Sequence, residues 1–294
     1  MANKFRDLFE TMRPKQWTKN ALVMAGFVFS IGDQTIAMEE HYFWKALAGT
    51  VLFCFMSSAV YLINDAKDVE QDRNHPVKKN RPIADGRLDR PFAVIVAIII
   101  SVAVLILSAL LSIEFAVVVG AYLLLQICYT LWLKHVGLLD VFIISGGFVL
   151  RAIAGAVVIE VEFSPWLLLC ASLLALFLAL CKRRHEKVLN DTANTTRESL
   201  NDYSEKLLDQ LIAVASSATI VCYSLYTLWP DTVMKFDTNK LALTIPFVIF
   251  GIFRYMDLVY RHNKGGHPEQ ILLTDGPLML DIALYAMCVL WILL

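Results

Sequence analysis

The sequence predicts an all-α fold: one domain built as a bundle of about nine membrane-spanning helices. Hydrophobic residues make up 57% of the 294 residues and the mean hydropathy is +0.59, whereas soluble proteins are roughly 45–50% apolar. Apolar windows of about 20 residues also recur, the length that a helix needs to cross about 30 Å of hydrocarbon. These runs are continuous rather than alternating, which favours helices over a closed barrel, since lipid tolerates only these two.

The spans follow one another without a linker that would divide the chain. The first follows a polar, basic start and lacks a small-residue cleavage site, so we expect this span to be retained. The second leads into an Asn-Asp-rich segment and the sixth into a basic one. We predict spans at 20–38, 43–63, 92–111, 115–133, 139–159, 164–181, 207–229, 242–260 and 276–294.

The distribution of positive charge predicts the orientation. With the N-terminus inside and nine crossings, nearly all Lys and Arg residues lie in the inner segments, and Lys45, Lys235 and Lys240 alone lie outside. The positive-inside rule therefore predicts a cytoplasmic N-terminus and an external C-terminus. The long inner connections, at about 64–91 and 182–206, are rich in charge. Because loops on a rigid scaffold often carry function, we expect the active site at the cytoplasmic face.

The first of these loops holds a row of oxygen ligands. If the second helix continues beyond its apolar part, Asn64, Asp68 and Asp72 are spaced by four residues and lie on one face, with Asp65 at its edge. Oxygen ligands on one face suit Mg²⁺, which usually shares the phosphate oxygens of a substrate.

Basic residues follow this row at once, namely Lys78, Lys79, Arg81 and Arg87. A metal that bridges diphosphate oxygens, with cations for the remaining charge, is what a diphosphate site needs. The alternative is a solvated, charged loop. The positive-inside rule explains the cations of such a loop, but it does not explain the carboxylates.

The string Asn64-Asp65-x-x-Asp68-x-x-x-Asp72 resembles the first aspartate-rich motif of the UbiA superfamily of intramembrane prenyltransferases. Its continuation through Arg81 to Gly86 is similar to one branch, the decaprenyl-phosphate phosphoribosyltransferases. Further strings that match this branch are Arg13-Pro-Lys-Gln-Trp-x-Lys19-Asn, Tyr129-x-x-x-x-Lys134-His135 with Asp140, Arg151-Ala-Ile-Ala-Gly155, Lys182-Arg183-x-x-Glu186, Glu198-Ser-Leu-x-x-Tyr203 and Arg254-Tyr255.

The resemblance implies a glycosyltransferase of the bacterial inner membrane, on the path to arabinose-containing envelope glycans. Such an enzyme moves a 5-phosphoribosyl group from phosphoribosyl diphosphate to a polyprenyl phosphate, with inversion at the anomeric carbon and Mg²⁺ as cofactor. Its partners are these two substrates and the bilayer, with no nucleic acid, and a homo-oligomer is compatible with it. The implied metal ligands and catalytic residues are Asn64, Asp68 and Asp72, and the implied donor-phosphate residues are Lys19, Asp65, Lys78, Arg81, Tyr129 and Lys134.

The second loop departs from the prenyltransferase pattern. In place of a second aspartate-rich motif it reads Cys181-Lys-Arg-Arg-His-Glu-Lys187. Cations there favour an anionic acceptor such as a lipid phosphate, to which we assign Arg151, Lys182, Arg183, Glu186 and Tyr203. An aromatic prenyltransferase that uses a prenyl diphosphate is the first alternative. A transporter is the second, although its charges would be expected near the midplane of the membrane.

Several of these residues also have structural interpretations. Lys19 sits near Trp17 and could anchor the chain at the interface. Arg151, within a span, could form structural hydrogen bonds instead of binding substrate. Asp140 could be a favourable charge at a helix start or a pocket residue. Tyr129 and Tyr203 could be interfacial aromatics.

Overall fold

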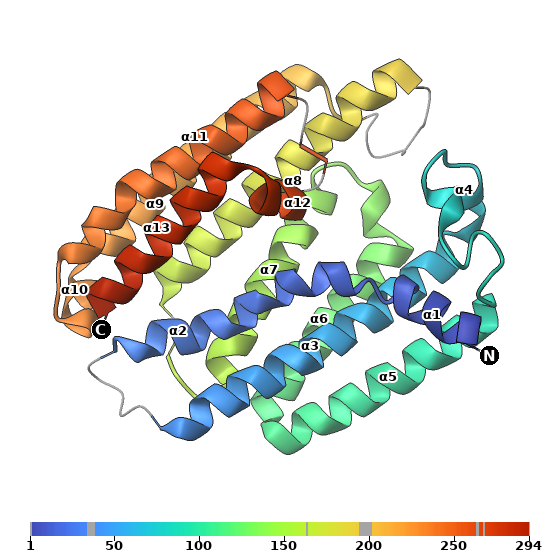
Figure 1. The fold of residues 1–294 in the computed structure, drawn as a ribbon, viewed down its shortest axis with the longest axis horizontal. Helices are drawn as coiled ribbons and strands as arrows, with labels where there is room; N and C mark the ends of the chain where they lie inside the picture. Colours follow the sequence, from blue (N-terminus) through green and yellow to red (C-terminus); the bar gives the residue numbers. More distant parts are fainter. Residues whose placement is uncertain are drawn as a thin grey trace. The chain divides into compact units, whose positions relative to one another are not determined.

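The computed structural model describes residues 2–33, 39–162, 164–193, 202–262, 265–266 and 268–293, without the side chains of 2, 3, 190–193 and 269. Within these residues the chain is helical and contains no β-strand (Figure 1). The all-α prediction is confirmed. Eight helices of the described part are long and apolar enough to cross a membrane.

The chain divides into two compact units. The first comprises residues 1–26, 41–134 and 150–161, and the second comprises 27–40, 135–149 and 162–294. In chain order the elements up to the middle of the sequence are α1 (Ala2–Thr11), the 3₁₀ helix η1 (Pro14–Met24), α2 (Ala25–Ile31), α3 (Glu40–Lys67), α4 (Val69–Arg73), η2 (Lys78–Asn80), α5 (Arg90–Leu111), α6 (Ile113–Leu131), η3 (Leu133–His135) and α7 (Leu139–Val158). The remaining elements are α8 (Pro165–Ala193), α9 (Glu205–Leu228), α10 (Pro230–Phe236), η5 (Lys240–Thr244), α11 (Ile245–His262), α12 (Pro268–Thr274) and α13 (Gly276–Leu293).

The predicted spans correspond closely to these helices, with two differences. The first predicted span, 20–38, contains the end of η1 and all of α2, and its residues 34–38 lie outside the described part. The sixth continues well beyond the predicted end at residue 181, because α8 reaches Ala193. Its extension has neither Pro nor Gly and begins with Lys, Arg and Glu, which are good helix formers. Lys182, Arg183 and Glu186 therefore lie on a helix rather than in a loop.

In the first unit, α5 and α6 form a hairpin around Ser112, whose side chain accepts a hydrogen bond from the backbone N–H of Phe115 at 3.3 Å. The core beneath the aspartate segment joins α3, α5 and the connection between them, with Leu62, Ala66, Ile83, Leu88 and Ala97 buried. This packing gives the polar loop after α3 an apolar base.

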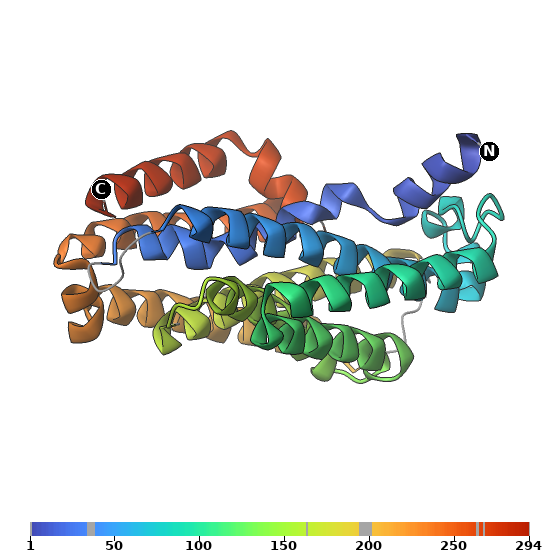
Figure 2. The ribbon, with the colours of Figure 1, turned by 90° about the horizontal axis from the view of Figure 1, so that it is seen from below.

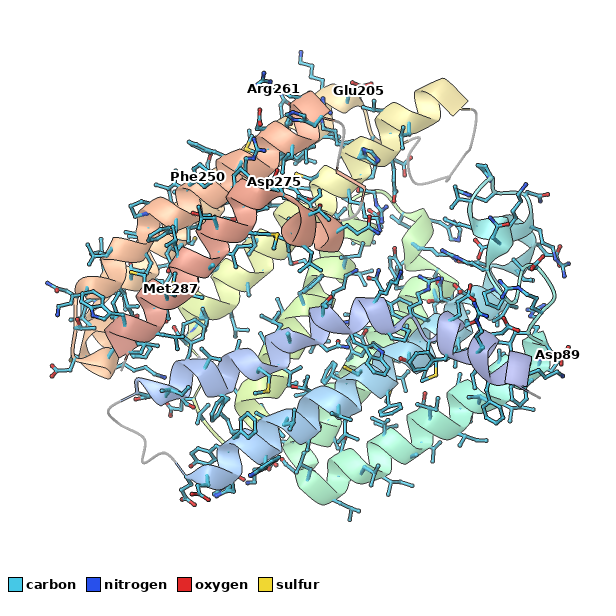
Figure 3. All side chains as sticks on the ribbon, in the orientation of Figure 1. Asp89, Glu205, Phe250, Arg261, Asp275 and Met287 are labelled. Atoms are coloured by element: carbon cyan, nitrogen blue, oxygen red, sulfur yellow. The ribbon has the colours of Figure 1, made fainter. Side chains whose placement is uncertain are left out.

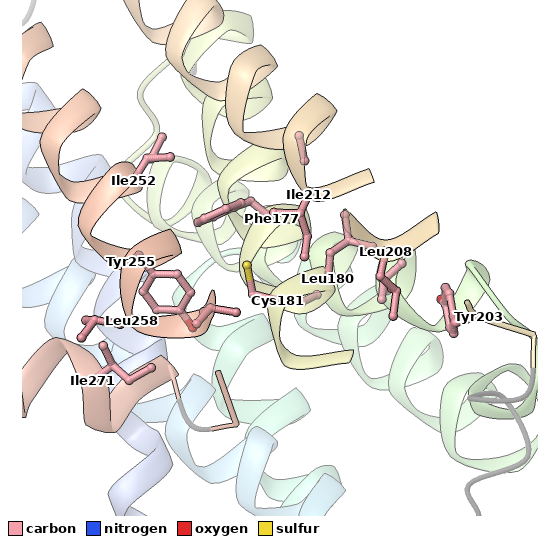
Figure 4. Close-up of a cluster of buried hydrophobic side chains, with 14 of the residues drawn as sticks. Phe177, Leu180, Cys181, Tyr203, Leu208, Ile212, Ile252, Tyr255, Leu258 and Ile271 are labelled. Carbon is pink, nitrogen blue, oxygen red and sulfur yellow. The ribbon is translucent and has the colours of Figure 1, made fainter. Parts of the chain in front are cut away.

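In the second unit, α9, α11 and α13 lie side by side (Figures 1 and 2). The core between α8, α9 and α11 includes Phe177, Leu208, Ile212 and Leu258 (Figure 4). Large apolar side chains also remain on the outside, for example Phe250 at 47% exposure (Figure 3). Apolar surfaces on such helices suit contact with lipid.

Candidate functional site

The aspartate segment keeps helical hydrogen bonding across the junction of α3 and α4. The N–H of Asp68 donates to the carbonyl of Asn64 at 2.9 Å, and the N–H of Asp72 donates to the carbonyl of Asp68 at 2.8 Å. These are the i to i−4 bonds of an α-helix. Asn64, Asp68 and Asp72 consequently follow one face, as the spacing predicts.

Arg81 connects two of the carboxylates. Its Nη1 lies 3.1 Å from Oδ1 of Asp65 and 2.6 Å from Oδ2 of Asp72, and both acids are almost completely buried. Burial raises the pKa of Asp72, and the charges of Arg81 and Lys78 act in the opposite direction. The structure thus brings Asp65, Asp72 and Arg81 together, and the charge of Lys78 acts on Asp72.

Arg13 is a second cation on Asp65, and the sequence interpretation did not include it among the site residues. Its Nη2 lies 2.5 Å from Oδ1 of Asp65, and its guanidinium lies 4.7 Å from the centre of the Tyr61 ring. The backbone of Arg13 is left-handed, with φ 53°, a conformation that is uncommon for a residue other than glycine. No local pattern signals this contact, because Arg13 and Asp65 are 52 residues apart in the sequence.

The other two members of the row also have partners. Lys134, from η3, donates to Oδ1 of Asp68, and the hydroxyl of Thr130 on α6 donates to Oδ1 of Asn64 at 3.3 Å. Each of the three carboxylates is therefore paired with a basic side chain. The predicted residues Lys19 and Tyr129 are half-buried in the same unit, on η1 and α6.

The donor set fits Mg²⁺ that arrives with a phosphate ligand. Asn64, Asp68 and Asp72 supply amide and carboxylate oxygens, and Mg²⁺ is usually held by one or two carboxylates together with substrate phosphates and water. In the described part of the chain, no group of three His, Cys, Asp or Glu side chains forms a ready-made metal site. The carboxylates face cations instead, which are the groups that would bind a diphosphate.

Arg87 fixes the loop that carries Arg81. It donates to Oδ1 of Asp7 at 2.5 Å, to Oδ2 of Asp85 at 2.8 Å and to the carbonyl of Asn80 at 2.8 Å. The neighbouring carboxylates, led by that of Glu10, raise the pKa of Arg87. Gly86 provides the turn, since its φ of 82° is one that side-chain-bearing residues rarely adopt.

Arg151, for which the sequence allows either structural hydrogen bonds or substrate contact, is hydrogen-bonded within the first unit. Its Nε donates to Oδ1 of Asn20 and its Nη2 to the hydroxyl of Tyr122, both at 2.8 Å. The side chain is 5% exposed and stacks on the Tyr122 ring. This geometry ties η1, α6 and α7 together, so it favours a structural role over contact with a lipid phosphate.

The second unit contains a separate buried ion pair. Arg183 on α8 donates from Nε to Oδ2 of Asp140 on α7 at 2.6 Å and from Nη1 to Glu186. The side chains of Arg183 and Asp140 are 2% and 0% exposed. Two carboxylates thus neutralise Arg183, and Lys182 beside it is half-buried.

Tyr203 completes this cluster. Its hydroxyl donates to Oδ1 of Asp140 at 2.7 Å and accepts from the N–H of Leu138, also at 2.7 Å. Burial, followed by the hydrogen bond to Asp140, raises the pKa of Tyr203. The hydroxyl therefore stays protonated and links the segment before α9 to the start of α7. Glu198, from the same sequence string, lies outside the described residues.

Arg254, from another of the strings, is also in a structural position. It donates to both carboxylate oxygens of Asp275, at 3.1 and 2.8 Å. Asp275 in turn accepts from the N–H of Leu278 and caps α13 (Figure 3).

Comparison with known proteins identifies the family. The model of the UbiA prenyltransferase family matches residues 22–270. The chain belongs to the UbiA prenyltransferase family. The apolar helices of this UbiA-family chain are those of a multi-pass membrane protein.

Two similar proteins carry a functional name. A decaprenyl-phosphate phosphoribosyltransferase of Mycolicibacterium smegmatis is 37% identical, over 95% of this UbiA-family chain and 89% of its own length. A protein of the same name from Corynebacterium glutamicum is 35% identical, over 96% of this chain and 85% of its own length.

Solved structures agree on the fold. A UbiA homologue from Archaeoglobus fulgidus, solved bound to GPP and Mg²⁺, matches this UbiA-family chain with a TM-score of 0.73 at 18% identity, over 98% of this chain and 99% of the other. At this identity the similarity establishes the fold alone.

Proposed function

We propose that this protein transfers a 5-phosphoribosyl group from phosphoribosyl diphosphate to decaprenyl phosphate and releases diphosphate. The observation that carries the proposal is the similarity, over nearly the whole chain, to two proteins named decaprenyl-phosphate phosphoribosyltransferase. This reaction makes the protein a pentosyltransferase that acts on a lipid in the membrane.

The aspartate cluster is the proposed donor site. Asn64, Asp68 and Asp72 would hold Mg²⁺, which when bound would neutralise charge on the diphosphate. Arg81 contacts the carboxylate of Asp72, and Lys134 contacts that of Asp68. The proposed contacts to the donor phosphates are these two cations together with Lys19, Lys78 and Tyr129. Asp65 orients Arg81. Because these cations are positioned before substrate arrives, little reorganisation is needed when charge develops.

The proposed reaction breaks the bond between the anomeric carbon and the diphosphate oxygen, and forms a bond from that carbon to an oxygen of the acceptor phosphate. The electron pair of the broken bond leaves with the diphosphate, so cations such as Arg81 stabilise the group on which charge accumulates. The acceptor is already an anion at neutral pH and needs orientation rather than a general base. Attack from the side opposite the leaving group inverts the configuration from α to β.

The acceptor phosphate is assigned to Lys182 and Arg183, with Glu186 and Tyr203 as positioning groups. The support for this assignment is the basic sequence 182–187, which stands where a two-metal prenyltransferase would carry a second aspartate motif. Arg183 is held by Asp140 and Glu186, and Lys182 immediately precedes it on α8. The tail of the lipid stays in the bilayer, along the apolar helices.

We further propose nine spans with the N-terminus inside, the C-terminus outside and the active site at the cytoplasmic face of a bacterial inner membrane. The distribution of Lys and Arg supports this orientation. Impermeant labelling of a cysteine introduced at Lys79, in intact cells compared with opened cells, tests it. Labelling of intact cells would contradict the orientation.

A lipid-transfer assay tests the function. The purified protein in nanodiscs is incubated with Mg²⁺, labelled phosphoribosyl diphosphate and decaprenyl phosphate, and the expected product is a labelled lipid. The control omits the acceptor. If no labelled lipid forms while a prenyl diphosphate and 4-hydroxybenzoate give a product, the protein is an aromatic prenyltransferase instead.

A further inference from the structure

Helix α1 has one polar and one apolar side, and part of the apolar side is open. Leu8 and Met12 pack on the core beneath the aspartate segment. Phe5 and Phe9, four residues apart and so adjacent on the helix, are 74% and 55% exposed. Two exposed phenyl rings on one short helix form an apolar surface that needs a partner.

This surface is continuous with an exposed aromatic side chain on a helix that is long and apolar enough to cross a membrane. Phe9 contacts Trp17 edge to face, with ring centres 6.2 Å apart, and Trp17 contacts Phe55 at 6.1 Å. Phe55 is 39% exposed on α3, one of the membrane-spanning helices. The aromatic strip therefore runs from a spanning helix onto α1, and Trp is a side chain that favours the membrane–water interface.

The opposite side of α1 holds the loop of the aspartate site. Asp7 and Glu10 both pair with Arg87, at 2.5 and 3.4 Å, and Lys4 pairs with Asp89 at 2.9 Å. The same loop carries Arg81, which contacts Asp65 and Asp72. A displacement of α1 would consequently remove charged contacts that fix this loop.

We propose that α1 is an interfacial helix whose Phe5 and Phe9 insert at the boundary between lipid headgroups and acyl chains, and that this docking holds the loop 78–89 in the geometry that binds the donor. An amphipathic helix with aromatic side chains on one side and charges on the other is suited to lie in that plane. The effect on donor binding rests on the proposed function, whereas the membrane docking of α1 does not.

Hydrogen–deuterium exchange tests the docking. The full chain is placed in nanodiscs of phosphatidylethanolamine and phosphatidylglycerol, and exchange is followed in residues 2–12 and 78–89. The double variant Phe5→Ser/Phe9→Ser should exchange on the order of tenfold faster in both segments, because the two phenyl rings proposed to insert into lipid are lost. The matched control is Phe250→Ser/Phe253→Ser, which removes two exposed phenyl rings from α11 and should leave both segments unchanged.

The outcomes separate the steps of the proposal. Unchanged exchange in residues 2–12 of the double variant would overturn the docking, and so would protection of wild-type α1 that depends on protein concentration, since a second copy would then cover it. Faster exchange in 2–12 alone would overturn the coupling to the loop. Titration with phosphoribosyl diphosphate and Mg²⁺ should show several-fold weaker binding by the double variant. If the wild type binds no donor, the proposed function fails, while the exchange result still decides the docking.

Discussion

Arg81 lies 2.6 Å from Asp72, which precedes it by nine residues in the segment that joins α3 to α5. This contact folds the connection back over the aspartate row. It also places a cation where a diphosphate would need one, beside carboxylates that could share a metal with it.

Arg81→Gln should lower the kcat/KM of phosphoribosyl transfer by about a hundredfold, because one preorganised donor to the leaving group is lost. Arg81→Lys should recover part of this loss, since it keeps the charge without the planar fork. A steady-state assay with labelled donor measures both. Arg90→Gln, on an exposed residue at the start of α5, is the control, and equal losses in Arg81→Gln and Arg90→Gln would refute a specific role.

Asp68→Asn should remove Mg²⁺-dependent donor binding while the protein stays folded. The amide has the shape of the carboxylate but lacks its negative charge, so the proposed site would lose one of its two anionic metal ligands. Isothermal titration with phosphoribosyl diphosphate and Mg²⁺ measures the affinity, and EDTA should have the same effect on the wild type. A variant that no longer folds, as judged by its thermal midpoint, would show that Asp68 is structural.

Removal of one partner of the buried pair Asp140–Arg183 should destabilise the protein strongly. Arg183→Met leaves Asp140 uncompensated, with an expected cost of roughly 3–5 kcal/mol. Tyr203→Phe removes one hydrogen bond to the same carboxylate and should cost about 1–3 kcal/mol. Thermal midpoints measure the order of these effects.

The control for the variants of the Asp140–Arg183 pair is Lys45→Met. It breaks an ion pair whose acid, Glu160, is 69% exposed. It should change the midpoint little. Should Arg183→Met retain the wild-type midpoint and lose only activity, the pair would not stabilise the fold, and its role would be confined to the acceptor site.

Gly155→Ala should destabilise the first unit. A Cβ at Gly155 would lie 2.0 Å from the backbone carbonyl oxygen of Val23, which cannot turn aside as a side chain would. Overpacking of this kind costs at least ~1–3 kcal/mol. Gly120→Ala is the matched control, since its nearest neighbour is a Leu105 methyl group 3.9 Å away. Similar midpoints for the two variants would contradict the close approach.

The pattern of apolar residues predicts most of the helices correctly. It fails where a helix continues through charged residues and where a contact joins distant parts of the chain. The fall in hydropathy predicts that the sixth span ends at residue 181, yet α8 continues to Ala193, since Lys, Arg and Glu form helices about as readily as Leu and Met. The sequence indicates Arg13 only as part of the string Arg13-Pro-Lys-Gln-Trp-x-Lys19-Asn. Its contact with Asp65 bridges 52 residues, a separation about which local sequence carries no information.

The sequence by itself determined the membrane-helical fold, its apolar segments and the row of Asn64, Asp68 and Asp72, because these depend on side-chain type and on hydrogen bonds between residues four apart. Only the tertiary structure decided which cation meets which carboxylate. Lys134 reaches Asp68 across 66 residues of sequence and Arg183 reaches Asp140 across 43. Such pairs are set by the packing of helices, which brings together charges that neither residue's own neighbours could specify.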